Sequence, residues 1–175
     1  MQNNWYAVYT KAHCERKVSL SLKKRNIEYF CPLNNKKSRQ LFLSVTVEQA
    51  VFSSYVFVKC SESEIVKLTK EIPAIRSLLY WKNKPATIKE EEIVAIKDFI
   101  SNHQEITIEK LETNFEKDNS SVSYLMDGQI LMIKNRIMKL RLPSLHLQMI
   151  AKLKEGEGVI GREISFGNKE MLVTS

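Results

Sequence analysis

Apolar and polar positions in the first hundred residues repeat with two periods, one typical of strands and one typical of helices. Trp5 to Tyr9 is a short, aromatic-rich stretch with the alternation of a strand. The next stretch changes period, because its apolar residues recur every four positions. This spacing predicts a helix over Ala12 to Arg25 whose buried side is made of Cys14, Val18 and Leu22.

Strands continue to interleave with helices along this half of the chain. The polar segment Asn34–Gln40 is predicted to be a loop or the tip of a hairpin. Further strands are predicted at Glu28–Cys31, Val45–Val47, Phe52–Lys59 and Ile75–Trp81.

Two capping boxes predict where the remaining helices begin. Ser61 with Glu64 opens a helix over Ser61–Lys70 that stops before Pro73. Thr87 with Glu90 precedes a helix whose apolar side is made of Ile93, Ile96 and Ile100. Interleaved strands and helices around an antiparallel sheet predict a ferredoxin-like α/β sandwich, of class α+β.

The last fifty residues have a different pattern. Met138, Leu140 and Leu142 alternate with Lys139 and Arg141, as in a strand with one wet face. Pro143 would interrupt a continuous helix here, which favours strands. A small SH3-like all-β barrel is predicted from short strands at Gln129–Ile133, Met138–Leu142, Leu145–Ala151, Val159–Ile164 and Glu170–Thr174.

Composition supports a division between these halves. All five glycines lie at Gly128 or beyond, and Glu112–Ser123 is polar, acidic and unpatterned, as expected of a linker. We therefore predict a first domain over residues 1–104, a linker over 105–123 and a small barrel domain over 124–175.

The net charge of +7 is concentrated near the start of the chain. Between Lys11 and Gln40 there are nine basic residues and two acidic ones, Glu15 and Glu28. Such a density attracts a polyanion, although a solvated helix face explains a basic run about as well.

Several kinds of chemistry are not indicated. The cysteines Cys14, Cys31 and Cys60 have no C-x-x-C spacing, and no metal site or cofactor is predicted. Gly156 to Gly161 matches the letters of a dinucleotide fingerprint, but strand-favouring residues follow where that motif needs a helix. No apolar run approaches the roughly 20 residues of a membrane span, and no signal peptide is recognisable, so a cytoplasmic protein is expected.

The first hundred residues resemble the opening domain of NusG-type transcription elongation and antitermination factors. The resemblance covers about residues 5 to 103 and rests on the order of several pieces. These are the Trp5-Tyr6 strand start, the basic helix with Val18 and Leu22, Pro32, the Phe52 to Val58 strand, and Pro85-Ala86-Thr87-Ile88 before Glu90-Glu91-Glu92-Ile93.

This resemblance implies a protein without catalytic activity that docks on the clamp helices of RNA polymerase and favours processive transcription. The apolar patch that would meet the clamp helices is Phe52, Tyr55, Phe57, Trp81, Ile93 and Ile96. Some of these six, the isoleucines first, are expected to fill the core instead.

Specialised members of the family also contact the exposed non-template DNA strand. The corresponding cations, which would contact DNA or nascent RNA, are Lys11, Arg16, Lys24, Arg25 and Arg76. Because Lys and Arg suit any phosphate, no target sequence follows from them.

Two departures from the family pattern limit what the resemblance implies. The irregular C-terminal half and the compact linker resemble a specialised, RfaH/UpxY-like paralogue of the kind that serves surface polysaccharide operons. The usual Phe-Pro-Gly-Tyr turn is here Phe52-Ser53-Ser54-Tyr55, without glycine's conformational freedom. The glycine-rich KOW pattern is also missing after Gly128. Rho and a ribosomal protein, the partners of this domain in general NusG proteins, are therefore carried over only as a resemblance.

Two alternatives remain open at this stage. One is an RNA-binding accessory protein that uses the basic helix and the barrel on structured RNA. The other is a small hydrolase with Cys60 or His13 as its reactive group, for which no constellation of acid, base and nucleophile is visible.

Overall fold

The computed structural model describes residues 2–40, 43–103, 105–111, 122–126, 129–134 and 137–152. The chain divides into two compact units, residues 1–93 and 94–175. The first contains, in order, β1 (Asn4–Thr10), α1 (Glu15–Lys24), β2 (Glu28–Phe30), β3 (Leu33–Gln40), β4 (Leu43–Ala50), β5 (Tyr55–Cys60), α2 (Glu62–Glu71), β6 (Ile75–Leu78), β7 (Tyr80–Trp81), β8 (Lys84–Pro85), β9 (Thr87–Ile88) and the start of α3 (Glu90–Asn102).

The central sheet of the first unit has the order β2-β5-β1-β6, with β9 also paired to β1. Every pairing in it is antiparallel. Apart from the hairpin β3–β4, the chain therefore runs β1-α1-β2-β5-α2-β6, which is the β-α-β-β-α-β order of a ferredoxin-like fold. The predicted arrangement of this half is confirmed.

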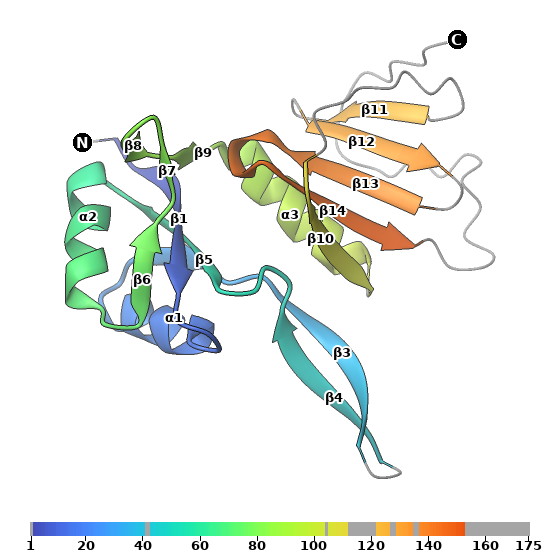
Figure 1. Cartoon of the computed structure of the whole chain (residues 1–175), viewed down its shortest axis with the longest axis horizontal. Coiled ribbons are helices and arrows are strands. Elements are labelled where there is room, and N and C mark those ends of the chain that lie inside the picture. The colour runs from blue at the N-terminus through green and yellow to red at the C-terminus, as the bar shows by residue number, and fades with distance from the viewer. Residues whose placement is uncertain are drawn as a thin grey trace. The chain divides into compact units, whose positions relative to one another are not determined.

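One face of this sheet is covered by α1 and α2 (Figure 1). Val18 and Leu22 of α1 and Ile65 of α2 are fully buried against strand residues of the same cluster. Cys14 packs at its margin. The four-residue spacing in the sequence thus identified the buried side of α1, and each such aliphatic side chain contributes roughly 1.5–3 kcal/mol by leaving water.

The helix ends follow local chemistry. Asn26 takes a left-handed conformation with φ 56° just after α1, and Ile27 N–H donates to the Leu22 carbonyl at 3.1 Å, which closes the helix. The Ser61 hydroxyl accepts from Glu64 N–H at 3.3 Å, so the Ser61 cap of α2 is confirmed. The Thr87 cap is wrong, because Thr87 lies in β9 opposite Tyr6 and α3 begins at Glu90.

The segment Asn34–Gln40 is neither a loop nor a hairpin tip. It is most of β3, which pairs with β4 from Leu33↔Ala50 to Gln40↔Leu43 and forms a long two-stranded ribbon that extends away from the sheet (Figure 1). The sequence of β3 is polar and lacks the hydrophobic alternation by which a strand is predicted. The single strand predicted over Ile75–Trp81 is also corrected, since it divides into β6 and β7.

The second unit contains the rest of α3 and a five-stranded antiparallel sheet. Its strands are β10 (Ile106–Lys110), β11 (Val122–Met126), β12 (Gln129–Lys134), β13 (Ile137–Leu142) and β14 (Leu147–Lys152), in the order β10-β14-β13-β12-β11. The short 3₁₀ helix η1 (Pro143–Leu145) separates β13 from β14.

Three of the five predicted strands in this half are present, and the alternation in β13 buries Met138, Leu140 and Leu142 as expected. Strands β10 and β11 were not predicted, and both overlap the segment that was expected to be a linker. The predicted strands Val159–Ile164 and Glu170–Thr174, the glycine motif at 156–161 and most of the linker lie outside the described residues. The domain boundaries therefore stay a prediction.

Candidate protein and nucleic-acid interface

The face of the first sheet opposite α1 and α2 carries a cluster of aromatic side chains. Alternation along β1 and β5 turns Tyr6, Val8, Val56 and Val58 to the helices and the intervening residues to this other face. The aromatic face, as it is called below, consists of Tyr9, Phe30, Phe52, Tyr55 and Phe57.

The rings of the aromatic face contact one another in a chain. Centroids lie 4.4 Å apart for Tyr9–Tyr55, 5.9 Å for Phe30–Phe57, 5.6 Å for Phe52–Phe57 and 6.3 Å for Phe52–Tyr55. These separations are typical of favourable aromatic pairs. Register explains two of the contacts, because Tyr9 is directly opposite Tyr55 and Phe30 is directly opposite Phe57.

This face has a buried floor and a partly exposed rim. Phe52 and Phe57 are fully buried, whereas Tyr9, Phe30 and Tyr55 are half-buried. The Tyr55 hydroxyl donates to the Tyr9 hydroxyl. Burial, followed by this hydrogen bond, raises the pKa of the Tyr55 phenol above its usual value, so this hydroxyl group is uncharged at neutral pH.

The turn before β5 fixes the position of Tyr55. Ser54 takes a left-handed conformation with φ 66°, which is unusual for a residue other than glycine. Its N–H donates to Glu15 Oε1 at 2.7 Å, and its carbonyl accepts from Thr10 N–H at 2.8 Å. The nearly buried Glu15 carboxylate and the end of β1 thus hold a bend that glycine would otherwise provide.

A polar cluster borders the aromatic face at the start of β1. Glu90, the first residue of α3, accepts from Trp5 Nε1 and from Lys59 Nζ, each at 2.8 Å. Lys59 Nζ also lies 5.5 Å from the centre of the Trp5 ring and 3.9 Å from Glu28. The hydrogen bond with Glu90 raises the pKa of the Lys59 ammonium, which stays charged as it ties β5 to the first turn of α3.

The structure brings together only half of the six residues predicted to meet the polymerase. Phe52, Tyr55 and Phe57 share the aromatic face, whereas Ile93 and Ile96 are fully buried in α3. Trp81 is 56% exposed, but it lies on the β7–β8 hairpin, beyond the edge of β1 that faces away from β5.

Sequence reasoning missed Tyr9 and Phe30 as members of this face. Tyr9 shares the strand alternation of Trp5 and Ala7, which was a usable signal once the inward face of β1 was assigned. Phe30 becomes part of the cluster only through the pairing of β2 with β5, which the sequence alone does not specify.

All five predicted nucleic-acid contacts, Lys11, Arg16, Lys24, Arg25 and Arg76, have exposed side chains. Lys11 N–H donates to the Ala74 carbonyl at 2.9 Å, so Lys11 lies beside the start of β6, where Arg76 is found. Arg16 belongs to the first turn of α1. Lys24 and Arg25 lie at the far end of this helix, roughly 13 Å further along its axis.

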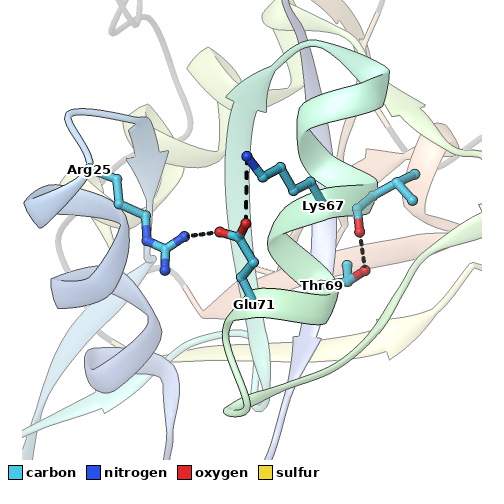
Figure 2. A network of polar contacts seen from close by, with 5 residues as sticks. Arg25, Lys67, Thr69 and Glu71 are labelled. Atoms are coloured by element: carbon cyan, nitrogen blue, oxygen red, sulfur yellow. Dashed lines mark hydrogen bonds and ion pairs between the residues drawn. The ribbon is translucent and has the colours of Figure 1, made fainter.

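Arg25 takes part in a contact within the protein. Its Nη1 lies 2.6 Å from Glu71 Oε2 at the end of α2, and Lys67 approaches the other oxygen at 3.6 Å (Figure 2). The hydrogen bond from Arg25 lowers the pKa of the Glu71 carboxyl, which therefore remains negative beside the guanidinium. Lys11 and Arg76 thus lie together near the start of β6, whereas Arg25 shares its charge with Glu71.

The hydrolase alternative gains no support from Cys60. This thiol is buried in the core cluster, and burial raises its pKa to about 12. A nucleophilic cysteine must instead be readily ionised and accessible. In the ranges that the structure describes, no three His, Cys, Asp or Glu side chains are placed to hold a metal ion. Nor is any described helix long and apolar enough to span a membrane.

The fold and the site define an α/β sandwich with an aromatic sheet face and a basic helix edge. The family model described as "Transcription termination factor nusG" matches residues 3–97, which is more than half of the chain, and the chain belongs to the NusG family. Proteins of this family are transcription elongation factors that bind RNA polymerase and are not enzymes.

A solved NusG structure agrees on the fold. A structure described as "Domain interaction in Thermotoga maritima NusG" is 16% identical, covers 87% of this chain and 94% of its own, and has a TM-score of 0.50. A crystal structure of an MjSpt4:Spt5 complex is also 16% identical, with 85% and 99% covered and a TM-score of 0.32. A search of curated proteins finds no match.

Proposed function

We propose that this chain docks on the clamp helices of RNA polymerase through the aromatic face, and that its docked first unit contacts exposed DNA and promotes processive transcription. The observation that carries the proposal is a rim of half-buried Tyr9, Phe30 and Tyr55 over the buried rings of Phe52 and Phe57. Aromatic side chains seated on a packed floor are the usual centre of a protein interface.

The proposed contact residues differ in role. Tyr55 offers both ring surface and a hydroxyl group to a partner, while Phe52 and Phe57 support it from below. Ile93 and Ile96 are buried, so they act on docking only through the fold. Trp81 lies apart from the aromatic face, and a separate role for it is argued below.

The basic residues are proposed to face DNA. Lys11, Arg16 and Arg76 lie around the end of β1 and the start of α1, while Lys24 and Arg25 extend the positive surface along the helix. Cations of this kind position a protein on phosphates without reading sequence. The proposal includes a role restricted to particular operons, such as those for surface polysaccharides. Membership of the NusG family supports this part of the proposal.

We also propose that the second sheet is part of a small, KOW-like barrel. The meander β11-β12-β13-β14 and the addition of β10 beside β14 support it. Backbone chemical shifts of the full-length chain are expected to report strands rather than helices over residues 124–175. Helical shifts over Met138–Leu153 would contradict the barrel.

Docking is tested by binding of core RNA polymerase to the full-length chain and to Tyr55→Ala. We expect the variant to lose at least about tenfold in affinity, as truncated hot-spot aromatics do. Phe57 is unsuitable for this test, because its fully buried ring would cost the fold roughly 3–5 kcal/mol when truncated to alanine.

Leu20→Ala is the matched control. Leu20 is 59% exposed on α1, which covers the opposite face of the sheet, so its truncation removes exposed apolar surface without touching the proposed interface. Equal polymerase affinity of wild type and Tyr55→Ala, with both proteins folded, would refute docking through the aromatic face.

A further inference from the structure

The β7–β8 hairpin is an insertion in the edge of the first sheet. Strand β6 pairs with the second half of β1 and β9 pairs with its first half, and the hairpin lies between them in sequence. Its base is held by Leu79 N–H donating to the Ala7 carbonyl and Ala86 N–H donating to the Leu79 carbonyl, both at 2.9 Å. The hairpin is therefore anchored to the central strand at its base.

The tip of the hairpin is a tight, well-defined turn. Tyr80 pairs with Pro85 and Trp81 pairs with Lys84, which leaves a two-residue turn of Lys82 and Asn83. Both turn residues have positive φ, 47° and 62°. This combination is that of a type I′ turn, whose twist matches the two flanking strands. The hairpin consequently presents its side chains in a defined geometry.

Two large rings are exposed on this hairpin. Tyr80 is 54% exposed and Trp81 is 56% exposed, whereas the other tryptophan, Trp5, is 2% exposed. Neighbouring residues on a strand point to opposite sides, so the hairpin carries one ring on each side. Neither ring completes the core.

The charge around these rings has one sign. From Arg76 to Lys89 the sequence contains four cations, Arg76, Lys82, Lys84 and Lys89, and no acidic residue. All four have exposed side chains. Accessible rings among cations are the combination by which proteins hold single-stranded nucleic acid, with bases stacked on rings and phosphates near ammonium or guanidinium groups.

We propose that the β7–β8 hairpin binds unpaired DNA by stacking bases on Trp81 and Tyr80, while Lys82 and Lys84 contact the phosphates. The choice of DNA rests on the proposed function, in which the basic surface of the same unit faces exposed DNA. Arg76 lies five residues before Trp81, a span of at most about 18 Å of extended chain, so one short stretch of DNA reaches both.

The two tryptophans supply a direct readout of this binding. Stacking of a base on Trp81 should quench its fluorescence, while the buried Trp5 should be unaffected. We therefore propose to titrate the full-length chain with a short oligothymidylate at low salt and to record tryptophan emission. Wild type is expected to lose the emission of the exposed indole, and Trp81→Ala should show almost no quenching.

Affinity is measured in parallel by anisotropy of the labelled oligothymidylate. Trp81→Ala should weaken binding by between about fivefold and a hundredfold, and Trp81→Phe should recover part of the loss because a phenyl ring also stacks. The exposed-leucine variant Leu20→Ala controls for general loss of apolar surface and should bind like wild type. Replacing both Lys82 and Lys84 by Gln should reduce the salt slope by about 1.4.

Three results would overturn the proposal. The first is no binding of the oligothymidylate by wild type, and the second is unchanged affinity and quenching after a folded Trp81→Ala substitution. The third is tighter binding and stronger quenching by oligouridylate, which would assign the hairpin to RNA.

Polymerase binding by the same variants separates this proposal from the docking proposal. Trp81→Ala is expected to bind core polymerase normally, and Tyr55→Ala is expected to bind the oligothymidylate normally. Failure of docking would therefore leave the oligonucleotide result intact. The stacking role would be refuted if Trp81→Ala lost polymerase binding but bound the oligonucleotide as before. Trp81 would then be assigned to the polymerase interface.

Discussion

The two faces of the first sheet are built by the same strands but contain different kinds of side chain. Towards α1 and α2 the strands present mainly aliphatic residues such as Val8, Val56 and Val58, which the helices bury completely. Towards the other side they present large rings, of which Tyr9 and Tyr55 also carry hydroxyl groups. The helix-covered face is therefore fully buried within the chain, while the aromatic face keeps partly exposed rings.

The sharpest way to test this difference is to truncate one leucine from each side of helix α1. Leu22→Ala should cost about 2–5 kcal/mol of unfolding free energy, because Leu22 is fully buried in the core cluster. Leu20→Ala, on the exposed side of the same helix, should change it by less than about 0.5 kcal/mol. Urea unfolding of both variants measures the difference, and similar midpoints would contradict the assignment of the core face.

Glu15 connects the two faces, so its substitution should affect both. Glu15→Ala removes the carboxylate that accepts from Ser54 N–H and should cost about 1.5–3 kcal/mol in thermal or urea unfolding. Affinity for core polymerase should fall as well, because the turn that positions Tyr55 loses its support. Adding Ser54→Gly, which adopts positive φ without strain, should recover part of both losses. Loss of stability with unchanged polymerase binding would show that the turn does not set the interface.

The smallest expected effect concerns Glu71 on the helix-covered side. Because Arg25 lowers its pKa, the ion pair stabilises the fold above the carboxyl's unfolded pKa, and this contribution is lost as pH falls through the lower folded pKa. Glu71→Gln should therefore flatten the acid side of a plot of Tm against pH. It should also raise oligothymidylate affinity slightly by releasing Arg25 to phosphates. Superimposable Tm profiles of wild type and variant would rule out the linkage.

How far the sequence predicts this fold depends on whether a segment faces a core. The spacing of Val18 and Leu22 and the alternation of Trp5 to Tyr9 were sufficient, since each element buries one side. Strand β3 was missed because its polar sequence has no hydrophobic alternation, and within the described residues it pairs only with β4. Thr87 carried the right letters for a cap, but the pairing of β9 with β1 decided its conformation.

The interface was harder to predict than the fold for a related reason. The sequence showed that Phe52, Tyr55 and Phe57 are close together along one strand and the turn before it. The contact of Tyr55 with Tyr9 joins residues 46 positions apart, and Trp81 was separated from them by a turn at Lys82 and Asn83 that lacks the common Asn-Gly signal. The Tyr9–Tyr55 contact and the position of Trp81 both depend on the register between distant strands, which composition and spacing do not encode.

The ribbon β3–β4 also has a consequence for self-association. It is eight residues long on each strand, and within the described part of the chain neither strand has a second neighbour, so both edges offer unpaired backbone groups to another molecule. The edge strands of the central sheet are much shorter. Lys36, Lys37 and Arg39 all lie in β3, and charged residues on such an edge discourage uncontrolled strand addition between copies.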